Sequence, residues 1–273
     1  MQMYKLIVSD LDETLLGRDG QISQDNIEAI KAASKKGAKF VPNTGRSFTS
    51  VQVLLKKLGL FQESNEFVIS YNGGAIVENK DNQILQTNEM TYEEGKGVFD
   101  ITSRYPENDT HVYTVDKLYI YNPRKEDLAY LEPRHVKYEI MDTDDFSIFK
   151  HDKIMKVITM NPDQNVQHQV HDEVMAAFDN KLNASYSSGM YAEFNHLGTD
   201  KGTATLELAK SLGIKKDEIL ALGDNSNDLP MLRKVGMPVV VANGTNEAKD
   251  LAKYVTKNNY RTGVAEAIHK FVL

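Results

Sequence analysis

The stretch "YKLIVSDLDETLL", residues 4–16, joins an apolar run to a cluster of acids. The apolar run predicts a strand over residues 3–9, and Asp10, Asp12 and Glu13 follow it within four positions. Acids this close together repel one another, and they also lose hydration when they are partly buried. A cluster of this kind at a strand end therefore needs a partner that compensates its charge.

Outward from this stretch, the first half of the chain alternates predicted strands and helices. The predicted strands are 3–9, 38–43 and 66–71, and the predicted helices are 24–35 and 47–58. The end of the chain repeats the alternation, with helices predicted over 203–213, 228–236, 245–254 and 263–271 and strands over 218–224 and 237–243. Such alternation implies parallel strands with right-handed crossovers. The expected fold class is α/β, with a doubly wound, Rossmann-like parallel-sheet core.

The middle of the chain has a different pattern. Residues 74–88 predict a hairpin that turns at Lys80–Asn82. After it, helices mix with strands of antiparallel type, such as "HVYTVDKLYIYN" and "KIMKVITM". We therefore expect an α+β domain inserted at residues 85–192, between the two parts of the core domain at residues 1–84 and 193–273.

Composition narrows the class of protein. The chain has 273 residues, a formal net charge of −7 and no cysteine. The negative charge argues against nucleic acid or an anionic membrane as partner, and the lack of cysteine excludes disulfides and thiolate metal sites. No apolar run approaches the roughly 18 residues that a membrane span needs, and the N-terminus lacks a signal-peptide pattern. These features predict a cytoplasmic protein.

Polar residues follow several of the predicted core strands. Ligands of doubly wound sheets bind at the carboxyl ends of the strands, so the residues just after each strand are candidates for a site. The segments expected at this edge are Asp10–Thr14, Asn43–Arg46, Tyr71–Gly74, Lys201 and Asp224–Asp228.

The charges of these segments predict a bound cation. Asp10, Asp12, Asp224 and Asp228 supply up to four negative charges, and Lys201 supplies one positive charge. Oxygen ligands without histidine or cysteine suit Mg²⁺, which binds one or two carboxylates, waters and a phosphate oxygen.

The same edge offers donors to an anion. Thr44 and the Gly45 amide, at the start of a predicted helix, supply neutral donors, and Lys201 supplies a charged one. A site that holds a cation and also presents anion donors fits a phosphate ester bound together with Mg²⁺.

Two aspartates two positions apart fit phosphoryl transfer. One carboxylate attacks phosphorus and forms an aspartyl-phosphate. The other protonates the leaving alkoxide and then deprotonates the water that hydrolyses the intermediate.

The segments "DLDET", "NTGR", "DKG" and "GDNSND" resemble the four ordered motifs of the haloacid dehalogenase (HAD) superfamily of phosphohydrolases. The large insert after the second motif is similar to the α/β (type IIB) cap of its Cof-type members. The resemblance implies that Asp10 is the nucleophile and a Mg²⁺ ligand. It implies that Asp12 is the general acid/base and binds the metal through its carbonyl, and that Lys201 stabilises the charge of nucleophile and phosphate.

The resemblance also assigns the remaining site residues. Leu11, Thr44, Gly45, Lys201 and Asn227 are expected at the phosphate. Asp224 is expected to bind the metal directly and Asp228 through water.

Two positions depart from the family pattern. Glu13 stands where Cof-type members often have glycine, and Asn43 stands where alanine is common. Neither change removes a catalytic atom, and Glu13 is left without an expected role.

The expected function is a Mg²⁺-dependent phosphatase that acts on a small phosphorylated metabolite, such as a sugar phosphate, as a monomer or small homo-oligomer. Two alternatives stay open. A phosphomutase or phosphotransferase would pass the phosphate of the same intermediate to a sugar. A receiver-like regulator or phosphometabolite sensor would bind without turnover. A dehalogenase would have no use for a metal or for Asp12 as an acid.

Overall fold

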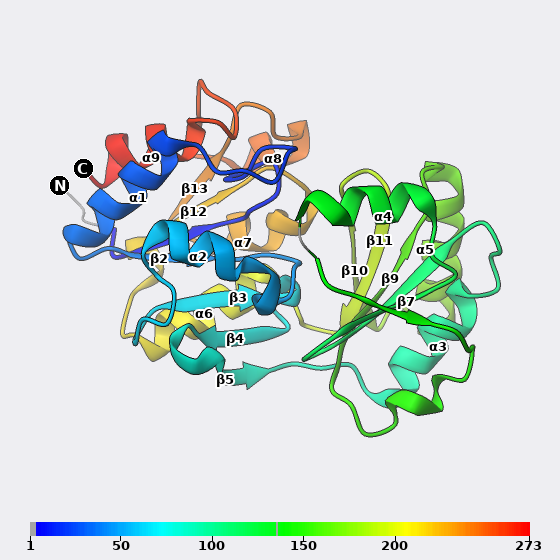
Figure 1. The fold of residues 1–273 in the computed structure, drawn as a ribbon. Helices are drawn as coiled ribbons and strands as arrows, with labels where there is room; N and C mark the ends of the chain where they lie inside the picture. Colours follow the sequence, from blue (N-terminus) through cyan, green and yellow to red (C-terminus); the bar gives the residue numbers. More distant parts are fainter. Residues whose placement is uncertain (1–3, 135) are drawn as a thin grey trace. The chain divides into compact units, whose positions relative to one another are not determined.

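The structure is a computed structural model that describes residues 4–134 and 136–273. It separates into two compact units (Figure 1). The core unit consists of the residues up to Thr87 together with Asp200–Leu273, and the inserted unit is Asn88–Thr199. The described residues include no helix that is long and apolar enough to cross a membrane. The domain limits predicted from the sequence, with the insert at residues 85–192, stay a prediction.

A five-stranded sheet forms the centre of the core unit, and all of its strands are parallel. The strand order is β14 (Tyr254–Val255), β13 (Met237–Val240), β12 (Ile219–Gly223), β1 (Leu6–Ser9) and β2 (Lys39–Pro42). The predicted α/β class with a parallel core sheet is confirmed. The short strand β14 was not expected, because the predicted helix 245–254 ends early, as α8 (Asn246–Leu251).

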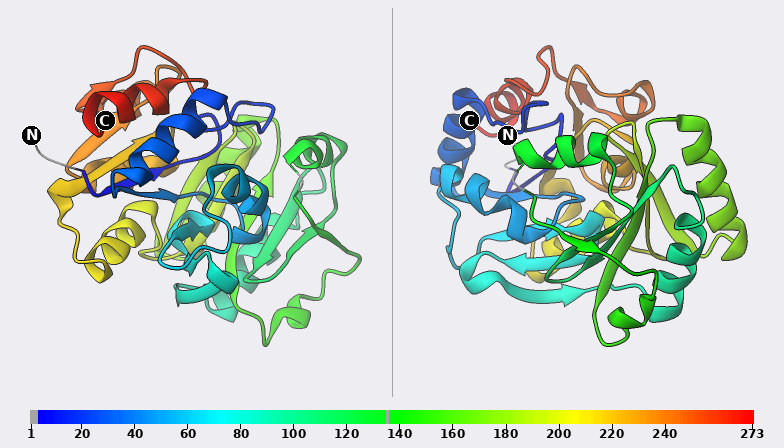
Figure 2. Two further views of the ribbon diagram at one scale, coloured as in Figure 1. Left: turned by 60° about the vertical axis from the view of Figure 1, so that its left-hand side comes forward. Right: turned by 45° about the vertical axis from the view of Figure 1, so that its right-hand side comes forward.

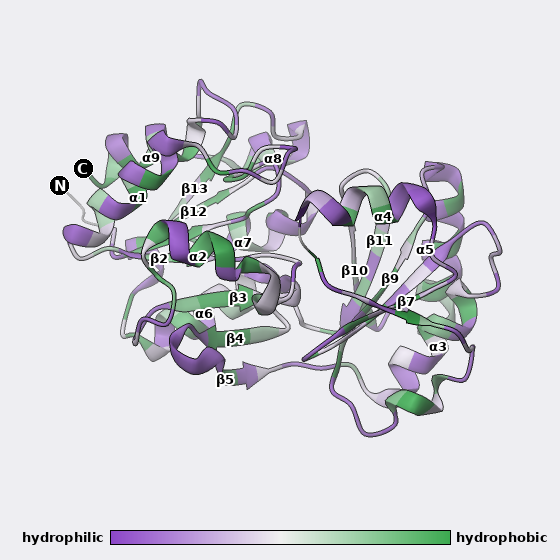
Figure 3. Cartoon of the chain, in the orientation of Figure 1, coloured by the Kyte–Doolittle hydropathy of each residue, from purple (hydrophilic) through white to green (hydrophobic). Residues whose placement is uncertain are grey.

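Helices cover both faces of this sheet (Figure 2). Helices α6 (Lys201–Ser211) and α7 (Leu229–Lys234) pack on one face, against alternate strand residues such as Leu6, Val8 and Ala221. Helices α1 (Gln24–Lys35) and α9 (Gly263–Phe271) pack together on the other face. The core strands are hydrophobic and the outer sides of the helices are polar (Figure 3). Strands buried on both sides explain the continuous apolar run of residues 6–8.

The predicted third core strand belongs to a different sheet. Strand β3 (Phe67–Ser70) pairs antiparallel with β4 (Ala75–Glu78), which pairs with β5 (Gln83–Thr87). A single parallel bridge, Asn43 to Ile69, links β3 to the end of β2. Beyond that bridge, the described residues form no further ladder between β2 and β3. The hairpin predicted to turn at Lys80–Asn82 is present as β4, a 3₁₀ turn and β5.

The inserted unit contains a six-stranded mixed sheet. Its order is β10 (Leu182–Ser187), β11 (Tyr191–His196), β9 (Ile154–Met160), β6 (Asp109–Thr114), β7 (Leu118–Tyr121) and β8 (Glu139–Met141). Helices α3 (Tyr92–Thr102) and α5 (Gln164–Ala177) pack against the sheet through one apolar cluster. Helix α4 (Lys125–Leu131) also belongs to this unit, and it buries Asp127 and Leu131. An α+β insert was expected from its mixed pattern.

Candidate active site

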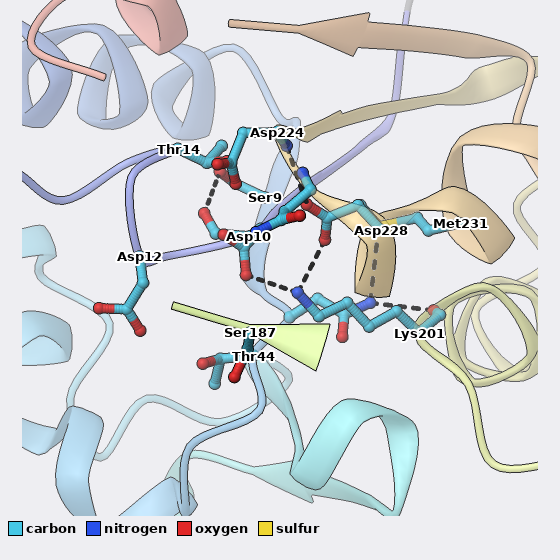
Figure 4. A network of polar contacts seen from close by, with 12 residues as sticks. Ser9, Asp10, Asp12, Thr14, Thr44, Ser187, Lys201, Asp224, Asp228 and Met231 are labelled. Carbon is cyan, nitrogen blue, oxygen red and sulfur yellow. Dashed lines mark hydrogen bonds and ion pairs between the residues drawn. The ribbon is translucent and has the colours of Figure 1, made fainter. Parts of the chain in front are cut away.

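A buried lysine joins two aspartates that are distant in the sequence (Figure 4). The Nζ of Lys201 donates to Asp10 Oδ1 at 2.5 Å and to Asp228 Oδ1 at 2.7 Å. Lys201 is the first residue of α6, Asp10 follows β1, and Asp228 follows β12. Lys201 and Asp228 are fully buried, and Asp10 is only 5 % exposed. The parallel order β12–β1 therefore brings these three side chains to the carboxyl edge of the sheet, as predicted.

Asp224 completes a group of three buried carboxylates. Ligand oxygens of Asp10, Asp224 and Asp228 all lie within 4.8 Å of one another. Thr14 Oγ1 donates to Asp224 Oδ1 at 2.9 Å, and the Asp224 amide donates to Asp228 Oδ2 at 2.8 Å. Gly223 makes this spacing possible, because a Cβ at that position would stand 2.6 Å from the Asp228 side chain.

The electrostatics of this group are unfavourable without a further positive charge. Burial raises the pKa of Asp10 to about 7, and the opposing charge of Lys201 offsets only part of that rise. Burial also raises the pKa of Asp224, and the charges of Asp10 and Asp228 add to the effect. For Lys201, the two aspartates outweigh the effect of burial and raise its pKa.

The donor set fits a hard divalent cation. Three carboxylates and one ammonium carry a net charge of about −2 when all are ionised, and oxygen ligands suit such ions. Both oxygens of Asp228 already accept hydrogen bonds, from Lys201 and from the amides of Asp224 and Asn225. This arrangement fits Asp10 and Asp224 as direct ligands better than Asp228.

The Thr44–Gly45 segment was predicted to lie at the start of a helix. This prediction is wrong, because the segment lies in a loop. The 3₁₀ helix η1 begins at Phe48 with Ser47 as its N-cap, and α2 (Gln52–Leu58) follows it. Thr44 is held on both sides, because its amide donates to Ile69 O and its carbonyl accepts from the Asn72 amide. The Thr44 hydroxyl accepts from the Arg46 amide at 3.1 Å.

The turn after β3 supports this loop. Tyr71 and Asn72 have left-handed backbone conformations, with φ of 55° and 58°, which cost energy for residues other than glycine. Gly73 follows at φ 99°, and a Cβ there would stand 2.4 Å from the Asp200 carbonyl. The "YNGG" segment thus fits closely against the residue before Lys201.

Asn43 is one of the two departures from the family pattern, and its side chain has a structural role. Its Nδ2 donates to Lys201 O at 2.9 Å and to Thr205 Oγ1 at 3.0 Å. The end of β2 is thereby connected to the first turn of α6. An alanine at this position could not make these bonds.

Asp12 is not part of the carboxylate cluster (Figure 4). Its carboxylate forms a two-point ion pair with Arg46, in which Nε donates to Oδ2 at 2.8 Å and Nη2 donates to Oδ1. The sequence placed Arg46 inside a motif but gave it no role. A positive charge next to the "TG" pair was the available signal.

Leu11 and Asn227 were expected at the phosphate. The Leu11 side chain is fully buried, and its carbonyl accepts from the amides of Thr14, Leu15 and Leu16. Only the backbone amide of Leu11 is therefore suited to an anion. Asn227 lies half-buried in the 3₁₀ helix Ser226–Asp228.

Comparison with known proteins gives the family. The family model described as haloacid dehalogenase-like hydrolase matches residues 7–268. The Bacillus subtilis (strain 168) protein YxeH, which carries a provisional phosphatase name, is 33 % identical over 280 residues, with 99 % of each chain covered. A second B. subtilis protein, 5-amino-6-(5-phospho-D-ribitylamino)uracil phosphatase YcsE, is 28 % identical, with 98 % of this chain and 96 % of the relative covered.

Solved structures agree with this result. A haloacid dehalogenase-like hydrolase from Bacteroides thetaiotaomicron superimposes with a TM-score of 0.84 at 27 % identity, over 98 % of this chain and 99 % of that one. A sugar phosphatase of HAD subclass IIB shares the fold with a TM-score of 0.84 at 20 % identity, over 98 % of each chain. With the family model spanning nearly the whole sequence and both units matched in structure, the chain belongs to the haloacid dehalogenase-like hydrolases, and its fold is that of the Cof-type, subclass IIB members.

Proposed function

We propose that the protein is a Mg²⁺-dependent phosphatase that hydrolyses small phosphorylated metabolites, such as sugar phosphates, through an aspartyl-phosphate on Asp10. The observation that carries this proposal is the buried contact of Lys201 with both Asp10 and Asp228, beside Asp224. The phosphatase names of full-length relatives support the reaction class. A cytoplasmic location and a monomer or small homo-oligomer belong to the same proposal.

In the first half-reaction, a carboxylate oxygen of Asp10 attacks phosphorus while the bond to the leaving oxygen breaks. Asp12 donates its proton to that leaving oxygen. In the second half-reaction, Asp12 accepts a proton from water as the water attacks phosphorus, which releases phosphate and restores Asp10. Lys201 keeps Asp10 oriented throughout, because its Nζ donates to Oδ1.

The remaining residues hold the phosphate and the metal. The Thr44 hydroxyl accepts from the Arg46 amide, which leaves its own proton available for donation to a phosphate oxygen. The Gly45 and Leu11 amides, Asn227 and Lys201 complete the proposed phosphate site. Asp10, Asp224 and the Asp12 carbonyl would hold Mg²⁺, with Asp228 acting through water. The ion would offset the negative charge that develops on the phosphoryl group.

The test is phosphate release from a panel of phosphorylated metabolites, with and without Mg²⁺, by the parent and by Asp10→Asn. We expect a loss of more than about 10³-fold in kcat for the variant, as is typical when a nucleophile is removed. Exposed Asp250 supplies the matched control, Asp250→Asn, which should keep the activity of the parent.

The variant should stay folded, because it removes one of three mutually repelling buried charges. A melting temperature measured without metal that is equal to or above that of the parent verifies this point. Turnover by Asp10→Asn at the parental rate, or full activity after removal of divalent ions, would refute the proposal. An isomerised sugar phosphate without free phosphate would instead indicate a mutase, and binding without turnover would indicate a sensor.

A further inference from the structure

Arg46 holds Asp12 in a geometry that only arginine can provide. The guanidinium contacts both oxygens of the carboxylate, Nε to Oδ2 at 2.8 Å and Nη2 to Oδ1. Parallel contacts of this kind fix the orientation of a carboxylate as well as its position. The pair is partly buried, with 13 % of the Arg46 side chain and 29 % of the Asp12 side chain exposed, so it is screened less than a surface ion pair.

The backbone on the arginine side is anchored at several points. The Arg46 amide donates to Thr44 Oγ1 at 3.1 Å, and its carbonyl accepts from the Tyr71 amide at 3.2 Å. The Tyr71 hydroxyl in turn donates to Ser47 Oγ at 3.0 Å. The guanidinium therefore extends from a fixed loop.

The aspartate side is anchored as well. Asp12 forms an isolated β-bridge with Leu16, and the Glu13 amide donates to Leu16 O at 3.0 Å. Asn243 Nδ2 donates to Glu13 O at 2.7 Å, which ties this turn to the far end of the chain. Two fixed loops joined by a two-point ion pair leave the Asp12 carboxylate little freedom.

We propose that Arg46 is a positioning residue that orients the carboxyl group of Asp12, which carries a proton in the first half-reaction, for transfer of that proton to the leaving oxygen. This inference rests on the proposed phosphatase function. A carboxylate oxygen has two acceptor sites, so a contact with arginine does not by itself exclude a contact with substrate. Proton transfer requires the two heavy atoms to be within hydrogen-bond reach, and a displacement of about 1 Å is enough to lower the rate strongly.

A positioning role differs from two other roles of an arginine at this place. An arginine that binds the substrate phosphate would chiefly change KM, and would do so for every phosphate ester. An arginine that only stabilises the loop would lower kcat for all esters alike. An arginine that acts through Asp12 matters most where the leaving group needs a proton, which is the case for an alkyl ester and much less for p-nitrophenyl phosphate.

The experiment compares kcat and KM for p-nitrophenyl phosphate and for the best alkyl phosphate of the metabolite panel. The variants are Arg46→Ala, Arg46→Lys, Asp12→Asn and the double variant Asp12→Asn/Arg46→Ala. We expect both Arg46 variants to lose at least about tenfold more kcat on the alkyl ester than on the aryl ester. Asp12→Asn should show the same difference between the two esters, but a larger one. Lysine should not rescue, because it keeps the charge without the two-point geometry.

The double variant tests whether Arg46 acts through Asp12. We expect it to be no slower on the alkyl ester than Asp12→Asn alone, since the effects of residues that act as a unit do not add. Arg233→Ala is the matched control, because Arg233 forms an exposed ion pair with Glu247 at 3.7 Å. Its ratio of alkyl to aryl activity should equal that of the parent.

Equal losses on both esters, a rise in KM alone, or additive effects in the double variant would each overturn the positioning role while the phosphatase proposal stands. Failure of the proposed function is a different result, because the parent itself would then release no phosphate from any ester. That outcome overturns both proposals and is seen before any variant is compared.

Discussion

Glu13 has a left-handed backbone conformation, with a φ of 62°. Its side chain makes an exposed ion pair with Arg18 at 3.2 Å, which contributes little to stability. Its carbonyl, by contrast, accepts from Asn243 and its amide donates to Leu16. What this position requires is therefore a backbone geometry, and glycine adopts that geometry without steric cost. Glycine is therefore compatible with this position, at which the present chain has glutamate.

Two substitutions separate the backbone effect from the lost ion pair. Glu13→Gly and Glu13→Ala both remove the contact with Arg18, but only alanine keeps a Cβ. We expect Glu13→Gly to be more stable than Glu13→Ala by about 1 kcal/mol, because the left-handed conformation costs about 1–2 kcal/mol for residues with a Cβ and the entropy of glycine offsets part of this. Urea unfolding of the two variants measures the difference. Equal stabilities would show that the turn carries no such strain.

At the scale of elements, one buried histidine connects a strand of the inserted unit to a helix. His111 lies on β6 and Asp127 on α4, and His111 Nε2 is 2.7 Å from Asp127 Oδ2. Asp109 Oδ1 lies 3.5 Å from the same nitrogen, and the side chains of all three residues are fully buried. Burial disfavours the charged imidazole, but the hydrogen bonds and charges of Asp109 and Asp127 outweigh it and raise the pKa of His111 to about 9. We infer that the protonated ring holds α4 on the sheet.

The inserted unit should therefore lose stability in mildly alkaline solution. The folded-state pKa of His111 lies above the unfolded value of about 6.5, so the contribution is complete below pH 6.5 and is lost as the pH rises through 9. At about 1.4 kcal/mol per pKa unit, the loss is on the order of 3 kcal/mol.

Hydrogen exchange of the β6 and α4 amides, followed from pH 6.5 to 9.5 and corrected for intrinsic rates, measures this loss within the inserted unit. His111→Gln should remove most of the pH dependence of the protection. If parent and variant share the same dependence, the histidine is not the group responsible.

At the scale of the whole molecule, the candidate site connects the two ends of the chain. Asp10 lies near the N-terminus, while Asp224 and Lys201 come after the inserted unit. An ion that binds Asp10 and Asp224 together links segments that separate on unfolding, so it stabilises the folded core unit. Without the ion, the free energy of unfolding of the core unit should fall as the pH rises from about 4 to about 7. Burial raises the pKa of Asp10 in the folded state to about 7, so the unfolded chain ionises this group at a lower pH.

Binding of Mg²⁺ should therefore release protons near neutral pH. Asp10, with a pKa of about 7 without metal, must be deprotonated to act as a ligand. We expect Mg²⁺ to raise the melting temperature of the parent, and its affinity to fall by up to about tenfold per pH unit below 7. Thermal melts over a series of Mg²⁺ concentrations at pH 6, 7 and 8 test both points. Asp224→Asn should lose the response and Asp250→Asn should keep it; a response of equal size in Asp224→Asn would place the ion elsewhere.

The sequence by itself determined the local elements and the chemistry they carry. Continuous apolar runs predicted β1 and β12, helical periodicity predicted α1, and the four motifs named the residues of the cluster around Lys201. These signals can be read from the sequence because helix ends, periodicity and strand–helix alternation depend on neighbours within a few residues. The convergence of Asp10, Lys201 and Asp228 was predictable for the same reason, since parallel strands bring their carboxyl ends to one edge.

Only the tertiary structure decided the individual contacts outside this cluster. It paired Asp12 with Arg46, used Asn43 to connect β2 with α6, moved β3 into a separate sheet and gave Glu13 and Tyr71 left-handed backbones. Each of these depends on contacts between segments tens to hundreds of residues apart, or on a turn whose geometry those contacts impose. Local periodicity contains no information about such contacts, because their energy arises only when the folded chain brings the partners together.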